Sequence, residues 1–187
     1  MRGLLIASVV AIGTLSGVAA VQHGRPGAET PAVGDWREIA WPFPRDGWPA
    51  GRAFRCGAES CGADVELYVR PKIGVCNCDT GVADDDEVDR VADLDLISEH
   101  FTPLEAGQAI AVADMSGRAR AYDLDMPDGS RHVATGIALS HRCDLLVAVA
   151  QGKGNGNGDA TTVQRAALAF LGSRDIAHWM MAALNGG

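Results

Sequence analysis

Alternation of apolar and polar residues is clearest at residues 64–75, which read DVELYVRPKIGV. Successive side chains of an extended strand point to opposite faces, so this period of two predicts a β-strand. Pro71 has no N–H donor, which allows a bulge or an edge position. The two predicted faces differ in polarity, with Val65, Leu67 and Val69 on one and Glu66, Tyr68 and Arg70 on the other.

The second half of the chain predicts an antiparallel meander. Its apolar runs are separated by short segments that hold Gly or Pro, the residues that tight turns favour. The last run is apolar throughout, which is typical of a strand at the centre of a sheet. The predicted strands are 109–114, 118–124, 132–139 and 145–150, with turns at 115–117 and 126–129.

Three helices are predicted beside these strands. Residues 84–86 are all Asp and precede Val88 and Val91, so their carboxylates are placed to cap the N–H groups of a first helical turn. A calcium loop would alternate oxygen ligands around a central glycine, and that pattern is absent here. Near the C-terminus, two amphipathic stretches are separated by Gly172 and Ser173, a stop and then a cap. Their apolar faces are expected to cover the sheet.

These elements predict an α+β fold, an antiparallel β-sheet with helices packed on its faces and stapled by disulfides. The chain has 187 residues, of which 47% are hydrophobic, which is enough for one domain with a real core. We place that single α+β domain at residues 36–187. Residues 21–35 are rich in Pro, Gly and Ala without periodicity, which indicates a flexible linker.

The N-terminus has the pattern of a secretory signal peptide, which we place at residues 1–20. Arg2 precedes a short apolar run, and small residues follow up to Ala20. Cleavage is favoured over an uncleaved anchor because the run is short for a membrane span. We therefore expect a periplasmic or secreted protein, in contact with a membrane only if this segment is retained.

The net charge of the mature chain argues against nucleic acid and anionic lipid as binding partners. Without residues 1–20 it has 15 basic and 24 acidic residues, a net charge of −9, and a protein this acidic is a poor candidate for binding nucleic acid or anionic lipid.

The glycine-rich stretch 151–160 is expected to be a flexible surface loop. It is not a phosphate-binding loop, because Gly rather than Ser or Thr follows Lys153.

Three of the four tryptophans fall in one proline-rich segment, WREIAWPFPRDGWPAGRAFRC. Prolines exclude a helix, so we expect an extended segment packed across the sheet. Trp36, Trp41 and Trp48 could form an aromatic platform for a ligand. Aromatic residues among prolines more often seal the edge of a core, and we favour that interpretation.

The five cysteines predict disulfides if the protein is exported. Cys56 and Cys61 flank the short loop GAES, which can bring their Cα atoms within bonding range. In an extended strand, the Cα atoms of Cys76 and Cys78 would be about 6.5–7 Å apart, at the limit for an unstrained bridge. We therefore expect one of the two to pair with Cys143, as Cys78–Cys143 or Cys76–Cys143, and the other to stay free.

A metal site is the alternative use of the same residues. His141 and Cys143 are two positions apart, and on a strand they would share a face with each other. If that strand lay beside Cys76 and Cys78, three thiolates and an imidazole would converge, a set that binds zinc and whose thiolates also suit Cu(I). The spacing is not the usual CxxC, and the acidic residues nearby argue against a reactive thiolate.

Three segments together resemble a family of small exported bacterial proteins that have no assigned activity. They are WPFPRDGWPAGRAFRC, LYVRPKIGVCNCDTGVADDDEVDRV and ALSHRCDLLVAVA, and the likeness covers roughly residues 35–184. The resemblance supplies no catalytic residues. The order of elements is also similar to that of PsbP-like domains, which implies a protein that binds or assembles partners.

The sequence therefore predicts an exported, non-catalytic binding or accessory protein with an unknown protein or small-molecule partner in the envelope. The five histidines fit none of the common catalytic patterns, and no cofactor is expected. The alternative is a metal-handling (Zn or Cu) or thiol-redox protein that uses Cys76, Cys78, His141 and Cys143. An enzyme of an unrecognised type is the third hypothesis.

Overall fold

The computed structural model describes residues 35–152 and 159–186. The chain divides into Met1–Thr30 and Pro31–Gly187, and all the described residues belong to the second unit. The predicted signal peptide, nearly all of the predicted linker and most of the predicted glycine-rich loop lie outside the described residues. In the described part, no helix has the length and apolar character needed to cross a bilayer.

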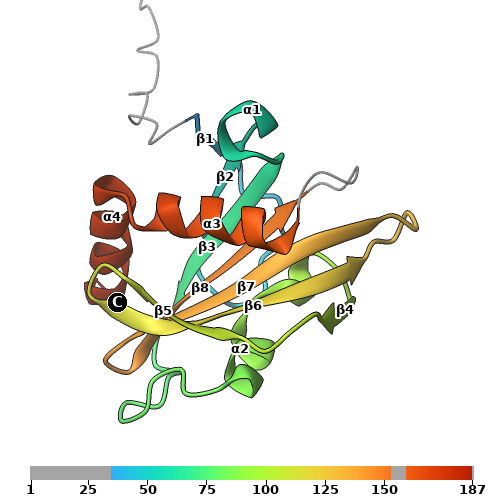
Figure 1. Cartoon of the computed structure of the whole chain (residues 1–187). Helices are drawn as coiled ribbons and strands as arrows, with labels where there is room; N and C mark the ends of the chain where they lie inside the picture. The colour runs from blue at the N-terminus through green and yellow to red at the C-terminus, as the bar shows by residue number, and fades with distance from the viewer. Residues whose placement is uncertain (1–34, 153–158, 187) are drawn as a thin grey trace, which may run out of the picture. The chain divides into compact units, whose positions relative to one another are not determined.

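The described residues form one antiparallel sheet of eight strands (Figure 1). The strand order is β1-β2-β3-β8-β7-β6-β4, and β5 also pairs with β6. The apolar strand that the sequence predicts at the centre is β8, which lies between β3 and β7 and is buried over most of its length. The strands are β1 (Arg37–Ile39), β2 (Arg52–Cys56), β3 (Val65–Lys72), β4 (His100–Pro103), β5 (Gln108–Val112), β6 (Met115–Asp125), β7 (Arg131–His141) and β8 (Asp144–Gly152).

The predicted meander is present as β6, β7 and β8, but one of its turns is displaced. The reversal between β5 and β6 falls at Ala113 and Asp114, where Ala113 has a φ of 50°, and not at residues 115–117. Met115 already pairs with Val112 and is buried, so burial of its side chain draws it into the strand. The turn expected at 126–129 lies where it was predicted, between β6 and β7.

The three predicted helices are present, and α1 and η1 are additional; α1 occupies the segment expected to be a short loop between Cys56 and Cys61. The carboxylate of Asp84 accepts the backbone N–H of Glu87 at 3.0 Å and so caps α2. Asp159 caps α3 in the same way, and Ser173 precedes α4 without a side-chain capping bond. The helical elements are α1 (Ala58–Cys61), α2 (Asp85–Val91), the 3₁₀ helix η1 (Leu94–Leu96), α3 (Ala160–Leu171) and α4 (Arg174–Asn185).

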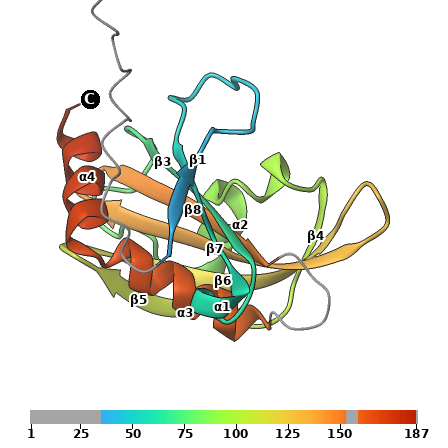
Figure 2. The ribbon, with the colours of Figure 1, turned by 90° about the horizontal axis from the view of Figure 1, so that it is seen from above.

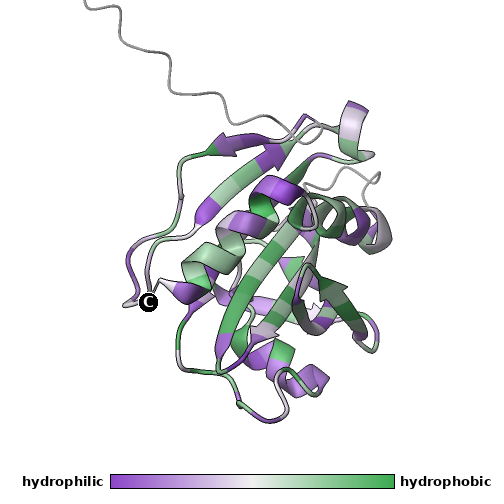
Figure 3. Ribbon diagram, turned by 90° about the vertical axis from the view of Figure 1, so that its left-hand side faces the viewer, coloured by the Kyte–Doolittle hydropathy of each residue, from purple (hydrophilic) through white to green (hydrophobic). Residues whose placement is uncertain are grey.

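Helices cover both faces of the sheet, as predicted for an α+β protein. Figure 2 shows α3 and α4 on one side of the sheet and α2 on the other. On the α3–α4 side, the Phe170 ring lies 4.6 Å from that of Trp36 and 4.8 Å from that of Phe54. On the α2 side, Val88 and Leu94 are fully buried against the sheet. Figure 3 shows the hydrophobic residues concentrated along the central strands.

The strand β3 departs from the prediction in one respect. Val65, Leu67 and Val69 are buried on the α3–α4 side, as the alternation implies. Its polar side is buried as well, because the 41–50 segment and the connection after α2 cover it. Only 3% of the surface of Arg70 is exposed, and Tyr68 is 6% exposed. This buried polar side of β3 is the starting point for the functional site.

Candidate functional site

The structure contains two disulfides among the described residues. Cys56 and Cys61 are bonded, with their Cα atoms 6.1 Å apart, and α1 lies between them. Cys78 is bonded to Cys143, and Cys76 is the free cysteine. The backbone N–H of Cys76 donates to the carbonyl oxygen of Cys143 at 3.2 Å. The two cysteine-bearing segments therefore lie side by side, and Cys78 is the partner of Cys143.

The geometry assumed for the metal alternative is wrong. Cys76 and Cys78 lie in the loop that follows β3, not on a strand. His141 ends β7, whereas Cys143 lies in the two-residue turn before β8, where Arg142 has a φ of 58°. His141 and Cys143 therefore do not share the face of one strand.

The chemistry of the predicted zinc or copper set fails with its geometry. Two of its three sulfur ligands are bonded to each other and cannot act as thiolates. Among the described residues, no group of three or more His, Cys, Asp or Glu side chains is arranged to hold a metal ion. The structure therefore favours the disulfide over the metal site for these residues.

The free thiol has an unfavourable setting for redox chemistry. Burial raises the pKa of Cys76, and the carboxylates of Glu87 and Asp144 raise it further. The guanidinium of Arg90 acts in the opposite direction but does not reverse the shift. Because the thiolate is the nucleophile in thiol–disulfide exchange, Cys76 is a poor attacking group near neutral pH.

The three N-terminal tryptophans have different environments. Trp36 is buried and stacks on Phe170, so it seals the core as predicted. Trp41 is half-buried on the opposite side of the sheet, with its ring edge-on to that of Tyr68 at 6.2 Å. Trp48 is also half-buried, and the ammonium of Lys72 lies 5.8 Å from the centre of its ring. Trp48 therefore keeps exposed ring surface, which a ligand platform requires.

The buried guanidinium of Arg70 holds the elements around Trp48 together. It contacts both carboxylate oxygens of Asp46, at 2.7 and 2.8 Å, and both of Asp93, at 2.6 and 2.8 Å. Lys72 donates to Asp93 at 2.7 Å and to the Val91 carbonyl oxygen at 2.9 Å. Through these bonds, β3 is connected to the 41–50 segment on one side and to the end of α2 on the other.

Electrostatics explains why such buried charges are tolerated here. An isolated buried charge is strongly unfavourable, whereas bidentate Arg–carboxylate pairs satisfy both partners. The hydrogen bonds from Arg70 lower the pKa of Asp46 from 3.8 to about 2, so this carboxylate stays ionised down to strongly acidic pH. We call Asp46, Arg70, Lys72 and Asp93 the charge cluster.

A pocket of about 450 Å³ opens beside the charge cluster. Such a volume is within the range of small-molecule sites, about 300–1,000 Å³. Trp48 and Phe101 contribute aromatic walls, and the segment from α2 to η1 contributes the carboxylates of Asp89, Asp93 and Asp95. The lining residues are Asp46, Trp48, Arg70, Lys72, Asp89, Arg90, Val91, Ala92, Asp93, Asp95 and Phe101.

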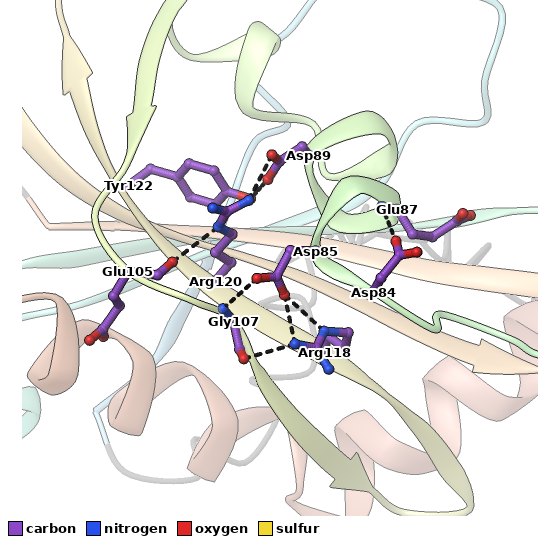
Figure 4. Close-up of polar contacts among 9 residues, drawn as sticks. All are labelled: Asp84, Asp85, Glu87, Asp89, Glu105, Gly107, Arg118, Arg120 and Tyr122. Carbon is purple, nitrogen blue, oxygen red and sulfur yellow. Dashed lines mark hydrogen bonds and ion pairs between the residues drawn. The ribbon is translucent and has the colours of Figure 1, made fainter.

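The helix that forms one wall of the pocket is fixed to the sheet by two ion pairs (Figure 4). Asp85 pairs with Arg118 at 2.7 Å, and one turn later Asp89 pairs with Arg120 at 2.8 Å. The hydroxyl of Tyr122 also donates to Asp89 at 2.6 Å. Because both carboxylates are anchored on β6, the pocket wall formed by α2 is preorganised.

Sequence reasoning missed this anchoring, although its signal is present. Asp85 and Asp89 are four residues apart and so share one face of a helix. Arg118, Arg120 and Tyr122 alternate along a strand and so share one face of the sheet. The acidic run predicts helix capping, which Asp84 performs, and the pairing of Asp85 and Asp89 with the arginines of β6 is a second role of the same run.

The titratable groups with a clear pKa shift share one property, an unchanged charge state at neutral pH. The carboxylates with a clear shift all have a lowered pKa, among them Asp46 and Asp85, which accept bonds from arginines or backbone N–H groups. Burial and a neighbouring carboxylate raise the pKa of Tyr68 and of Tyr122. These shifts keep each group in its ordinary charge state at neutral pH, whereas a general acid or base needs a pKa near the working pH.

Comparison with known proteins assigns no family to the chain. No family model and no curated protein matches it. A crystal structure of a Pseudomonas aeruginosa protein of unknown function is similar at a TM-score of 0.38 with 14% sequence identity. That similarity covers 75% of this chain and 85% of the other, and it carries no functional argument.

Proposed function

We propose that the protein is an exported, non-catalytic binding or accessory protein of the bacterial envelope. Its ligand or partner occupies the pocket between Trp48, the charge cluster and the segment from α2 to η1. One observation carries the proposal: a buried arginine and its carboxylates hold three separate segments around a preformed pocket. A protein that needed this cluster only for stability would gain as much from apolar packing at the same place.

The disulfides support location in an oxidising compartment. Two bonded cysteine pairs are typical of secreted or periplasmic proteins and rare where thiols are kept reduced. The signal-like N-terminal sequence and the resemblance to small exported proteins agree with this location. Fractionation of the native host, with N-terminal sequencing of the mature chain, tests export. A mature chain that starts close after Ala20 supports it, and an intact chain in the cytoplasm contradicts it.

Binding at the pocket can be tested without knowledge of the ligand. The probe is the fraction below 3 kDa, an ordinary cut-off for small molecules, of a heat-treated envelope extract from the native host. Because a ligand of the folded state raises its stability, this fraction should increase the Tm of the purified full chain. The Tm of Trp48→Ala should rise less.

Trp179→Ala is the matched control for that experiment. Trp179 is also half-buried and has an arginine close to its ring, with the Arg52 guanidinium 5.0 Å from the ring centre. It lies on α4, outside the pocket. If the extract raises the Tm of wild type and Trp179→Ala but not of Trp48→Ala, the pocket is the site. Equal shifts in all three proteins, or no shift in any, would contradict the proposal.

A further inference from the structure

We propose that the pocket beside the charge cluster binds a neutral polyhydroxylated ligand, a short saccharide. This inference rests on the proposed binding function and adds the chemical class of the ligand. Three features of the pocket support it: the pairing of the charges in its walls, the hydrogen-bonding positions that those pairs leave open, and the aromatic rings beside them.

The charges that line the pocket are already paired within the protein. Arg70 and Lys72 are neutralised by Asp46 and Asp93, and Asp89 is bound by Arg120 outside the pocket. The guanidinium of Arg90 pairs with Glu87, although its side chain is 61% exposed, so this pair is weaker than those of the charge cluster. An anionic ligand would have to compete with these carboxylates for their partners, and a cationic ligand with the arginines. Either exchange would leave a charge of the protein without its partner, which is unfavourable near a buried cluster.

Asp95 is the exception among the described lining residues. It is exposed and takes part in none of the ion pairs of the described chain. One unpaired carboxylate at an exposed position contributes little attraction for a cation at physiological salt, because screening is strong there.

Both the carboxylate of Asp89 and the ammonium of Lys72 keep hydrogen-bonding positions that the ion pairs do not use. A carboxylate has about four acceptor positions, and Asp89 uses two of them, for Tyr122 and Arg120. The ammonium of Lys72 has three donors and uses two, for Val91 and Asp93. A hydroxyl group both donates and accepts, so neighbouring hydroxyls can meet the remaining acceptors and donors without displacing an ion pair. A sugar ring presents such hydroxyls in a fixed arrangement.

The aromatic walls provide the second part of the recognition. Trp48 is half-buried, and Phe101 forms another wall of the same pocket. The C–H face of a sugar ring is apolar and can pack on an aromatic ring, while the hydroxyls at its edge reach the polar groups. The pocket volume of about 450 Å³ suits one or two sugar rings rather than a long chain.

Calorimetric titration of the full chain tests this ligand class. The saccharide probes are maltose, cellobiose and chitobiose, and the charged probes are arginine methyl ester and citrate. We expect binding of at least one saccharide at concentrations up to about 10 mM, the range of weak small-ligand affinities. Trp48→Ala should weaken it about tenfold, whereas Trp179→Ala should leave it unchanged.

Two further measurements separate neutral from charged recognition. Saccharide affinity should change by less than about twofold between low and high salt, because no net charge is neutralised. Neither arginine methyl ester nor citrate should displace the bound saccharide, because each would have to break ion pairs of the charge cluster. Strong salt dependence, or displacement of the saccharide by either charged probe, would overturn the assignment of a neutral ligand.

The ligand class and the binding function can fail separately. Periodate cleaves vicinal diols, so oxidation of the envelope extract with periodate should abolish the Tm shift that depends on Trp48. If that shift survives periodate, or if arginine methyl ester or citrate binds and none of the saccharides does, the ligand class is wrong while the binding function stands. If the untreated extract gives no shift and no probe binds, both proposals are overturned.

Discussion

The two faces of the sheet are covered in different ways. On the α3–α4 face, side chains of both helices pack on apolar residues of the strands, and the aromatic contacts centre on Phe170. On the other face, the apolar contacts of α2 are combined with ion pairs, the buried pair of Arg70 with Asp93 and the partly buried pairs between α2 and β6. Apolar packing fills space, whereas ion pairs fix positions and leave polar groups available. The α3–α4 face therefore has the character of an apolar core, and the proposed binding function falls on the other face.

The largest expected effect is on the apolar face. Phe170→Ala removes a buried ring that contacts both Trp36 and Phe54, so we expect the free energy of unfolding to fall by about 4 kcal/mol. Urea denaturation with two spectroscopic probes measures this change. Phe101→Ala on the other face removes a half-buried ring and should cost about half as much. Equal losses would contradict the apolar-core character of the α3–α4 face.

The second largest loss of stability is expected from a substitution that breaks the charge cluster. Asp93→Asn leaves Arg70 and Lys72 short of a buried counter-charge, so we expect a loss of about 3 kcal/mol in the free energy of unfolding. Glu38→Gln is the control, because the Glu38–Arg52 pair is more exposed and should contribute less than about 1 kcal/mol. If denaturation gives the two variants the same stability, the buried cluster does not hold this face together.

A smaller difference is expected between the two disulfides. Reduction of Cys78–Cys143 frees a loop with a sequence separation of 65 residues, against 5 for Cys56–Cys61. Loop-closure entropy then predicts that the double variant Cys78→Ser/Cys143→Ser loses about 2 kcal/mol more than Cys56→Ser/Cys61→Ser. Denaturation of both variants under non-reducing conditions measures the difference. A larger loss for the short loop would show that packing of the buried Cys56 outweighs chain entropy.

The smallest effect concerns acid stability of the charge cluster. The pKa of Asp46 is lowered from 3.8 to about 2 in the folded chain, so its stabilising contribution is present above pH 3.8 and is lost as the pH falls towards 2. In Asp46→Asn, the free energy of unfolding should be lower at neutral pH and should decline less steeply between these pH values. Parallel pH profiles for wild type and variant would rule out this linkage.

Periodicity alone predicts much of the fold. The alternation in β3, the acidic cap of α2 and the apolar stripes of α3 and α4 all depend on neighbours within a few residues. Strand pairing does not, because β3 lies beside β8, which is about 80 residues further along the chain. Loop closure over such distances leaves no local pattern in the sequence.

The candidate pocket is harder to predict from the sequence, because its residues also come from distant parts of the chain. Arg70 falls on the polar side of its strand, which a local pattern places in water. It is buried because Asp46 and Asp93, both more than 20 residues away, converge on it. The sequence places all three tryptophans in one segment and so treats them alike, either as a ligand platform or as part of the core. The structure separates Trp36, which belongs to the core, from Trp48, which lines the pocket.

The long separation between Cys78 and Cys143 also sets an order of events during biosynthesis. A chain that emerges N-terminus first presents Cys56 and Cys61 almost together, so that pair can close at once. Cys76 and Cys78 emerge long before Cys143, so the Cys78–Cys143 bond cannot close until the β7–β8 turn has been synthesised.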